Sequence, residues 1–195
     1  MYKLIYCDPP WQFSNKKTGG SMKSGADANY PTMTIDDLKR MDIPSIADED
    51  CLLVMWWVGS MPQEAIDLVN AWGFKIKNMN GFVWNKLTVR DKPFFGMGFY
   101  SRAGSESCII ATRGKPKIVD RGVRAVFAET DDVDFVASYR VGKHSAKPNA
   151  FRKKCLQLVG DVPRLEMFAR VNSDGWDVYG NECEDSISIP FKEQL

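Results

Sequence analysis

The stretch Leu4-Ile5-Tyr6-Cys7-Asp8-Pro9-Pro10-Trp11 decides the fold of this chain. Its first half is a short apolar run that predicts a buried strand. Its second half places an acid, two prolines and an aromatic residue directly after that strand. In open α/β sheets, ligands bind beyond the carboxyl ends of the strands. The stretch therefore predicts a binding loop at a sheet edge.

The prolines shape this loop, because each fixes φ near −65° and lacks an N–H group. We expect a stiff turn in which the Asp8 and Pro9 carbonyl groups stay available as acceptors beside the flat Trp11 ring. Such a loop matches a planar ring with an exocyclic amine, as in adenine or cytosine. The same four residues are also typical of an ordinary turn at the end of a strand. Their position after a buried strand favours the binding interpretation.

Strand patterns alternate with helix signals along the rest of the chain, which predicts a mostly parallel sheet with helices on both faces. Further strands are expected at 52–57, 74–84 (with a turn at Asn80-Gly81), 107–112, 165–169 and 176–179, with an edge strand at 187–191. Helices are expected after Thr34, from Pro62 to Gly73, and from Pro148 to Gly160. The sequence has no internal repeat or linker, so we expect one domain over residues 1–195.

Composition and short motifs disfavour a metal site, a membrane span and a dinucleotide-binding turn. The chain has 26 Lys and Arg against 25 Asp and Glu, so its charge neither indicates nor excludes a nucleic-acid partner. The five cysteines form no C-x-x-C pair and the only histidine is His144, so no metal site is expected. Unpaired cysteines without a signal peptide favour a cytoplasmic location, and no apolar stretch is long enough for a membrane. Gly96-Met97-Gly98 lacks the third glycine of a dinucleotide-binding turn.

A second group of polar residues points to the same sheet edge. Lys147 precedes a proline at an expected helix start, where free N–H groups and an ammonium favour a carboxylate or phosphate. A surface lysine beside a helix is the plainer alternative. Four more polar residues follow two expected strands and suit hydrogen bonds to a ribose and an adenine, although Asn and Gly also favour turns. They are Arg170, Asn172, Asn181 and Glu182.

Basic residues and one aromatic are candidates for holding a nucleic-acid backbone. Segment 12–33 is rich in Gly, Ser, Lys and Asn, so we expect a long mobile loop there that becomes ordered over a bound base. Each basic cluster is also compatible with a solvated surface. The candidates are Lys16, Lys17, Lys23, Tyr30, Lys86, Arg90, Arg102, Arg113 and Lys115.

Several short motifs occur in one specific order. They are Asp8-Pro9-Pro10-Trp11, Tyr30-Pro31-Thr32-Met33, Leu53-Val54-Met55-Trp56, Trp72-Gly73-Phe74, Val83-Trp84-Asn85-Lys86, Gly98-Phe99-Tyr100-Ser101-Arg102, Glu106, Arg113-Gly114, His144-Ser145-Ala146-Lys147-Pro148, Leu165 to Arg170 and Gly175 to Glu182. In this order they resemble the adenine-N6 methyltransferases typified by the catalytic subunit of the eukaryotic mRNA adenosine methyltransferase complex. That group also contains bacterial and bacteriophage DNA adenine methyltransferases.

The resemblance implies a Rossmann-like methyltransferase fold with the catalytic motif before the cofactor motif and S-adenosylmethionine as cofactor. It implies that Asp8, Pro9, Pro10 and Trp11 are catalytic, with Asp8 contacting both the target amine and the cofactor and Trp11 stacking on the base. Lys147 would bind the methionine carboxylate. Arg170, Asn172, Asn181 and Glu182 would line the ribose and adenine pocket. The product would be S-adenosylhomocysteine.

DNA is the expected substrate, because the compact chain is similar to the bacterial and phage members. RNA adenosine methylation is the first alternative, and a non-catalytic nucleic-acid-binding subunit on the same fold is the second. Cytosine methylation is disfavoured, since enzymes of that type typically have Ser in place of Asp8. The expected setting is the cytoplasm of a bacterial or phage-infected cell, without a membrane partner, and a homodimer stays open.

Overall fold

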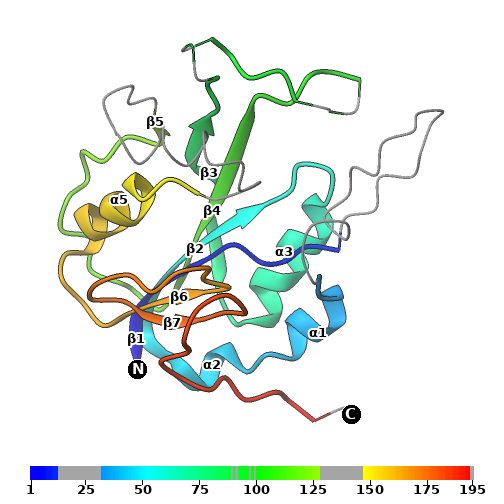
Figure 1. The fold of residues 1–195 in the computed structure, drawn as a ribbon. Helices are drawn as coiled ribbons and strands as arrows, with labels where there is room; N and C mark the ends of the chain where they lie inside the picture. The colour runs from blue at the N-terminus through cyan, green and yellow to red at the C-terminus, as the bar shows by residue number, and fades with distance from the viewer. Residues whose placement is uncertain are drawn as a thin grey trace.

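The computed structural model describes residues 1–12, 32–88, 90, 92–96, 98, 100–127 and 147–193. The described strands are β1 (Tyr2–Cys7), β2 (Ala47–Trp57), β3 (Lys75–Asn85), β4 (Ser105–Arg113), β5 (Val126–Phe127), β6 (Arg164–Met167) and β7 (Asp177–Tyr179). The described helices are α1 (Ile35–Arg40), α2 (Ile43–Ile46), α3 (Pro62–Ala71) and α5 (Ala150–Val159). The seven strands form one sheet with helices on either side (Figure 1).

The strand order is β5-β3-β4-β2-β1-β6-β7. In this sheet β1 pairs in parallel with β2 and β6, β6 with β7, and β3 with β5. Only β4, among the described strands, runs antiparallel to its neighbours, β2 and β3. The expected α/β fold with a mostly parallel sheet is therefore confirmed.

Strand β1 shows why its sequence is apolar without alternation. Ile5 and Cys7 point into a core shared with α1 and α3. Leu4 and Tyr6 point into a second core, shared with α5. A strand covered on both faces needs apolar residues at every position, and Figure 1 shows α3 and α5 on opposite sides of the sheet.

Local signals set several helix boundaries as expected. The Thr34 side chain caps α1 by accepting a hydrogen bond from the Asp37 backbone N–H at 3.1 Å. Helix α3 begins at Pro62, and Gly73 follows its end with φ of 78°. Gly160 ends α5 with the same φ, a left-handed conformation that glycine adopts without a Cβ penalty. No helix in these described ranges combines the length and apolar character needed to span a bilayer.

Two expected boundaries are wrong. Helix α5 begins at Ala150, so Pro148 precedes the helix, and Lys147 is not part of a free helix N-terminus. Residues 187–191 form no edge strand, because they turn away to cover α1 and α2. In that tail, Ile189 is buried in the α1–α3 core and Pro190 accepts a hydrogen bond from the Asp42 N–H at 2.8 Å.

The turn expected at Asn80-Gly81 is also absent. Strand β3 continues through these residues with shifts in its pairing to β4 between Asn78 and Phe82. A Cβ at Gly81 would overlap the Ile110 side chain on β4, including the Ile110 Cβ at 2.9 Å. Glycine is needed at this position because β4 approaches closely, a recognised role of strand glycines.

We therefore predict that Gly81→Ala destabilises the protein by about 1–3 kcal/mol, since the new methyl group collides with Ile110 in a packed sheet. Chemical denaturation measures this change. Gly59→Ala is the matched control, because nothing lies within 4 Å of a Cβ built at Gly59. The explanation requires partial rescue of Gly81→Ala by Ile110→Ala in a double-mutant cycle. Equal stability of the two glycine variants would contradict it.

Candidate active site

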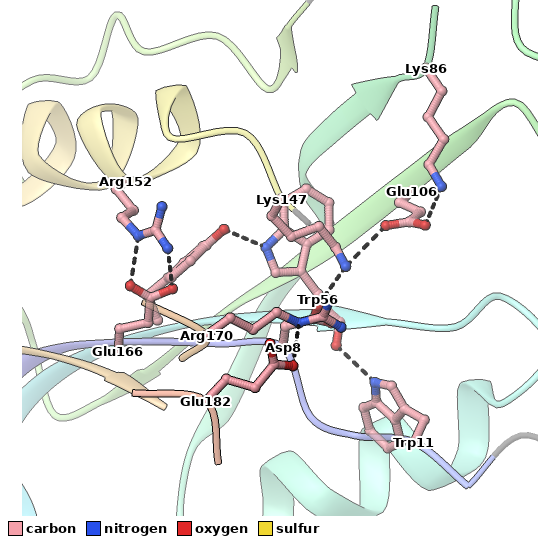
Figure 2. Close-up of polar contacts among 11 residues, drawn as sticks. Asp8, Trp11, Trp56, Lys86, Glu106, Lys147, Arg152, Glu166, Arg170 and Glu182 are labelled. Atoms are coloured by element: carbon pink, nitrogen blue, oxygen red, sulfur yellow. Dashed lines mark hydrogen bonds and ion pairs between the residues drawn. The ribbon is translucent and has the colours of Figure 1, made fainter. Parts of the chain in front are cut away.

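The register of three parallel strands places the polar residues at one sheet edge. Cys7 pairs with Met167, and Met167 pairs with Tyr179. The residues that follow these three positions therefore leave the sheet side by side. They are Asp8, the 168–170 turn and the 180–182 loop, and Figure 2 shows Asp8, Arg170 and Glu182 together there.

A chain of alternating charges runs through this edge. Lys147 donates to Asp8 at 2.6 Å and lies 3.2 Å from the Glu106 carboxylate on β4. Lys86, just after β3, donates to the same Glu106. Figure 2 shows Asp8, Lys147, Glu106 and Lys86 in this spatial order, with Asp8, Glu106 and Lys86 at the ends of three strands. The side chain of Lys147 is 9% exposed, whereas that of Asp8 is 32% exposed.

Burial and these neighbours set the protonation of the site. Burial acts to lower the pKa of Lys147, but the carboxylates of Asp8 and Glu106 outweigh it and raise that pKa above its usual value. Burial also acts to raise the pKa of Glu106, yet Lys147 and Lys86 outweigh it and lower the pKa to about 2. For Asp8, burial raises the pKa and Lys147 opposes the rise. Lys147 is thus a fixed cation between two acids.

The proline loop is stiff, but its acceptors are partly used. The Trp11 backbone N–H donates to the Pro9 carbonyl at 2.8 Å, and the Met33 N–H donates to the Pro10 carbonyl at 3.0 Å. The Pro9 carbonyl, which was expected to stay available as an acceptor, therefore already has one donor. A carbonyl oxygen carries two lone pairs, so Pro9 keeps capacity for a second donor.

Trp11 is held inside the core. Its side chain is 4% exposed and its indole N–H donates to the Trp56 carbonyl at 3.2 Å. This burial does not favour the expected stacking on a base, because the ring face is covered by the α1–α3 core. The indole instead anchors the loop that carries Asp8. Base stacking by Trp11 stays a prediction that requires the ring to become uncovered.

Trp56 connects the loop, the lysine and a buried ion pair. Its ring lies 5.2 Å from the Lys147 ammonium, and its indole N–H donates to the Tyr6 hydroxyl at 2.8 Å. Beside Tyr6, Arg152 on α5 forms a two-pronged pair with Glu166 on β6 at 2.5 and 2.6 Å (Figure 2). Bidentate pairing of this kind fixes orientation. The network locks α5 onto the sheet and so places Lys147.

The expected ribose and adenine residues lie in the loops after β6 and β7. Phe168 has a left-handed φ of 60°, an uncommon conformation that marks a sharp turn just before Arg170. Arg170 Nε lies 3.8 Å from Glu182 Oε1. Asn172 exchanges hydrogen bonds with the Glu184 backbone, so its amide braces the loop. Asn181 is exposed on that loop.

Two nucleic-acid candidates lie at the wrong end of the sheet. Arg113 ends β4 opposite Cys51, whereas the active edge of β2 lies at Trp57. Its guanidinium donates to the Pro44 carbonyl at 2.7 Å, and the Lys115 N–H donates to Asp50 at 2.6 Å. These contacts join α2, β2 and β4. Both residues lie far from the site because β4 is antiparallel to β2, so its last residues leave the sheet at the opposite end.

The other nucleic-acid candidates fall into two groups. Lys86, Arg90 and Arg102 belong to the connection between β3 and β4, and Lys86 is engaged with Glu106. Lys16, Lys17, Lys23 and Tyr30 lie outside the described residues, as do nearly all of segment 12–33 and His144.

Reasoning from the residues gave no role to two members of this polar network. Glu106 appears in the motif order without a role, and Trp56 looks like a core residue of an apolar strand. Glu106 could have been identified from the sequence because it is a lone acid in a strand whose other residues suit a core. Within the described ranges, no three His, Cys, Asp or Glu side chains are grouped to hold a metal ion.

Comparison with known proteins agrees with this geometry. The MT-A70 family model matches residues 2–182. The chain is 31% identical over 209 residues to the type II methyltransferase M.MunI of Mycoplasma sp, covering 100% of this chain and 83% of that protein. It is 22% identical over 187 residues to the human N(6)-adenosine-methyltransferase catalytic subunit METTL3, covering 94% of this chain.

A further similarity, 26% over 195 residues, is to the N(6)-adenine-specific methyltransferase METTL4 of Mus musculus. The chain spans 28% of METTL3 and 37% of METTL4. Fold, site and similarity together define an α/β methyltransferase. This chain belongs to the MT-A70 family.

The charge chain predicts a pH-dependent stability. Because the Glu106 pKa falls from 4.5 to about 2 on folding, its ionised form stabilises the protein above about pH 4.5, and this contribution is lost as the pH falls toward 2. Glu106→Gln should therefore lower the free energy of unfolding by on the order of 2–3 kcal/mol near neutral pH. Denaturation across pH measures the difference, which must shrink in acid. Glu49→Gln, at an exposed carboxylate, is the control, and a pH-independent deficit in Glu106→Gln would contradict the ion-pair account.

Proposed function

We propose that this protein transfers a methyl group from S-adenosylmethionine to the N6 amine of adenine in DNA. The observation that carries the proposal is Asp8, which directly follows β1, sits on a proline-stiffened loop and is held at 2.6 Å by Lys147. An acceptor fixed in this way suits an exocyclic amine with two N–H donors. The MT-A70 match supports the reaction class.

DNA is favoured over RNA by the extent of the similarities. The type II methyltransferase M.MunI matches along the whole of this chain and 83% of its own length. The relatives named as adenosine methyltransferases match at lower identity over a small part of theirs. RNA adenosine methylation is the second candidate, since a further relative, MTA1 of Pyricularia oryzae, is named as an N6-methyladenosine RNA methyltransferase. The intact Asp-Pro-Pro-Trp motif disfavours a non-catalytic subunit.

The residues at the sheet edge fit S-adenosylmethionine. Its amino-acid part is a zwitterion, and the site offers both charge signs within one cluster, with Lys147 and Arg170 as cations and Asp8 and Glu182 as acids. Lys147 would hold the carboxylate by trading part of its contact with Asp8 or Glu106. Glu182, whose side chain is 50% exposed, and Asn181 suit ribose hydroxyls. When bound, the cofactor supplies an activated methyl group on sulfur.

The protein's own part in the reaction is to position and polarise the amine. The adenine amine is a weak nucleophile because its lone pair is delocalised into the ring. Lys147 occupies Asp8 Oδ2, and in this proposal Asp8 Oδ1 accepts one N–H of the amine. The second lone pair of the Pro9 carbonyl accepts the other. These two acceptors draw the amine toward a tetrahedral geometry, and fixed dipoles of this kind are worth several kcal/mol.

Proton release completes the step. The amine gains a positive charge when the new N–C bond forms and the bond from carbon to sulfur breaks. Its surplus proton is passed to water, which reaches the partly exposed Asp8 carboxylate. Because Asp8 is paired with a cation, it works as an acceptor and not as a strong base.

Two substitutions of Asp8 test this role. Asp8→Ala removes the acceptor and should abolish methyl transfer, while Asp8→Asn keeps a carbonyl oxygen and should retain weak activity. Transfer of tritiated methyl groups to matched DNA and RNA oligonucleotides measures both the role and the substrate, under single-turnover conditions with saturating cofactor. Near-normal transfer by Asp8→Ala would contradict the active-site assignment. Transfer to RNA alone would replace DNA by the second candidate.

Lys147→Ala tests the cofactor site. The substitution should weaken S-adenosylmethionine binding by about 1.5–3 kcal/mol, the usual worth of a charged hydrogen bond. It should also lower the melting temperature, because Asp8 and Glu106 lose their shared cation. Titration calorimetry measures the affinity, with Lys153→Ala on the exposed side of α5 as control. Unchanged cofactor affinity in Lys147→Ala would rule out the carboxylate contact.

A further inference from the structure

The described residues of the connection between β3 and β4 (86–88, 90, 92–96, 98 and 100–104) form a hairpin-like arm. The Lys86 N–H donates to the Gly104 carbonyl at 2.8 Å, and the Lys86 carbonyl accepts a hydrogen bond from the Phe94 N–H at 3.0 Å. Further out, Gly96 and Ala103 exchange both backbone hydrogen bonds, at 2.7 and 3.2 Å. These backbone bonds and the isolated antiparallel bridges Leu87–Pro93 and Gly96–Ala103 tie the described part of the arm together. We refer to residues 86–104 as the β3–β4 arm.

Two glycines hold the strands of the arm close together. A Cβ at Gly96 would overlap the Ala103 carbonyl oxygen, and a Cβ at Gly98 would overlap the Ser101 carbonyl oxygen. Backbone atoms cannot move aside as a flexible side chain can, so both positions require glycine. These glycines therefore build the arm and do not bind a phosphate.

The outer part of the arm presents aromatic rings to solvent. Tyr100 is fully exposed and has a left-handed φ of 61°. That conformation is uncommon for a bulky residue, and such strain concentrates at functional positions. Phe95 is 72% exposed, and the Arg102 guanidinium lies 5.0 Å from its ring centroid. The arm thus displays two aromatic faces with a cation beside one of them.

The charge of the arm identifies the partner. Beyond Lys86, which is paired with Glu106, its sequence contains Arg90, Lys92 and Arg102 against a single acid, Asp91. Aromatic rings interleaved with basic side chains are the combination that binds nucleic acid, in which bases stack on the rings and phosphates pair with the cations. A flat base is also the natural partner of an exposed Tyr with few rotatable bonds.

The arm arises at the active edge of the sheet. Lys86 at its base contacts Glu106, which lies 3.2 Å from Lys147, the partner of Asp8. Figure 1 shows the arm projecting away from the body of the protein beyond the ends of β3 and β4. A strand whose adenine reaches Asp8 therefore has its flanking nucleotides within reach of the arm.

We propose that the β3–β4 arm stacks on bases next to the target adenine through Tyr100 and Phe95. This inference rests on the proposed function and adds the β3–β4 arm as the element that binds the flanking nucleotides. Stacking holds the strand beside the site once the target base has left its own stack. The basic residues of the arm supply the phosphate contacts.

Tyr100→Ala tests the stacking. The full-length variant should bind a fluorescein-labelled DNA duplex of mixed sequence roughly 5- to 100-fold more weakly, the range expected for one stacked base. Tyr100→Phe keeps the ring and should stay within about twofold of wild type. Phe191→Ala is the matched control, because Phe191 is a partly exposed ring on the C-terminal tail and its ring packs against Arg40 of α1. Fluorescence anisotropy measures each affinity.

Three further readouts separate the possible outcomes. The slope of affinity against salt should be unchanged in Tyr100→Ala and reduced in Arg102→Ala, because only the latter removes a phosphate contact. Cofactor affinity should be unchanged in both. Wild-type methyl transfer with equal DNA affinity in Tyr100→Ala would overturn the arm's role and leave the proposed function standing. Loss of self-association by sedimentation, without weaker DNA binding, would assign the arm to a second copy of this chain instead. Absence of methyl transfer by the wild type would overturn the proposed function itself.

Discussion

The contact between Lys147 and Asp8 joins two parts of the chain that are 139 residues apart, and the arrangement of the site depends on it. Asp8 is placed by the end of β1 and the proline loop. Lys147 is placed by α5, which the Arg152–Glu166 pair holds against the sheet. Glu106 and Lys86 extend the same charges to β4 and β3. A shift of any of these elements separates buried charges from their partners, which is strongly destabilising.

The local pattern predicted the features that local physics controls. The apolar run before Asp8 predicted β1, Thr34 predicted a helix cap, and the glycines after α3 and α5 predicted helix ends. The edge position of Arg170 and Glu182 also followed from strand order, because parallel strands end together. Because Pro148 follows Lys147, the sequence predicted that Lys147 binds the carboxylate of a ligand. The structure instead pairs Lys147 with carboxylates of the protein itself.

The features that the sequence did not reveal depend on distant pairing. The antiparallel direction of β4 brings Glu106 to the active edge and carries Arg113 to the opposite one. The local pattern predicts a turn at Gly81, whereas the structure shows that glycine there admits Ile110 from β4. The burial of Trp11 follows from the packing of α1 and α3, which no pattern within the motif indicates. The same reversed strand creates the β3–β4 arm, so one change of direction gives this fold both Glu106 at the active edge and the arm that we propose contacts nucleic acid.

Mapping N6-methyladenine in the DNA of cells that express this chain tests the central claim most directly. The account predicts methyl groups on adenine at a defined DNA sequence in cells with the wild-type protein, and none in cells with an equal amount of folded Asp8→Ala protein. Marks that persist with Asp8→Ala, or DNA without modified adenine in cells containing folded wild-type protein, would contradict the claim that Asp8 and Lys147 form the centre of a DNA adenine methyltransferase.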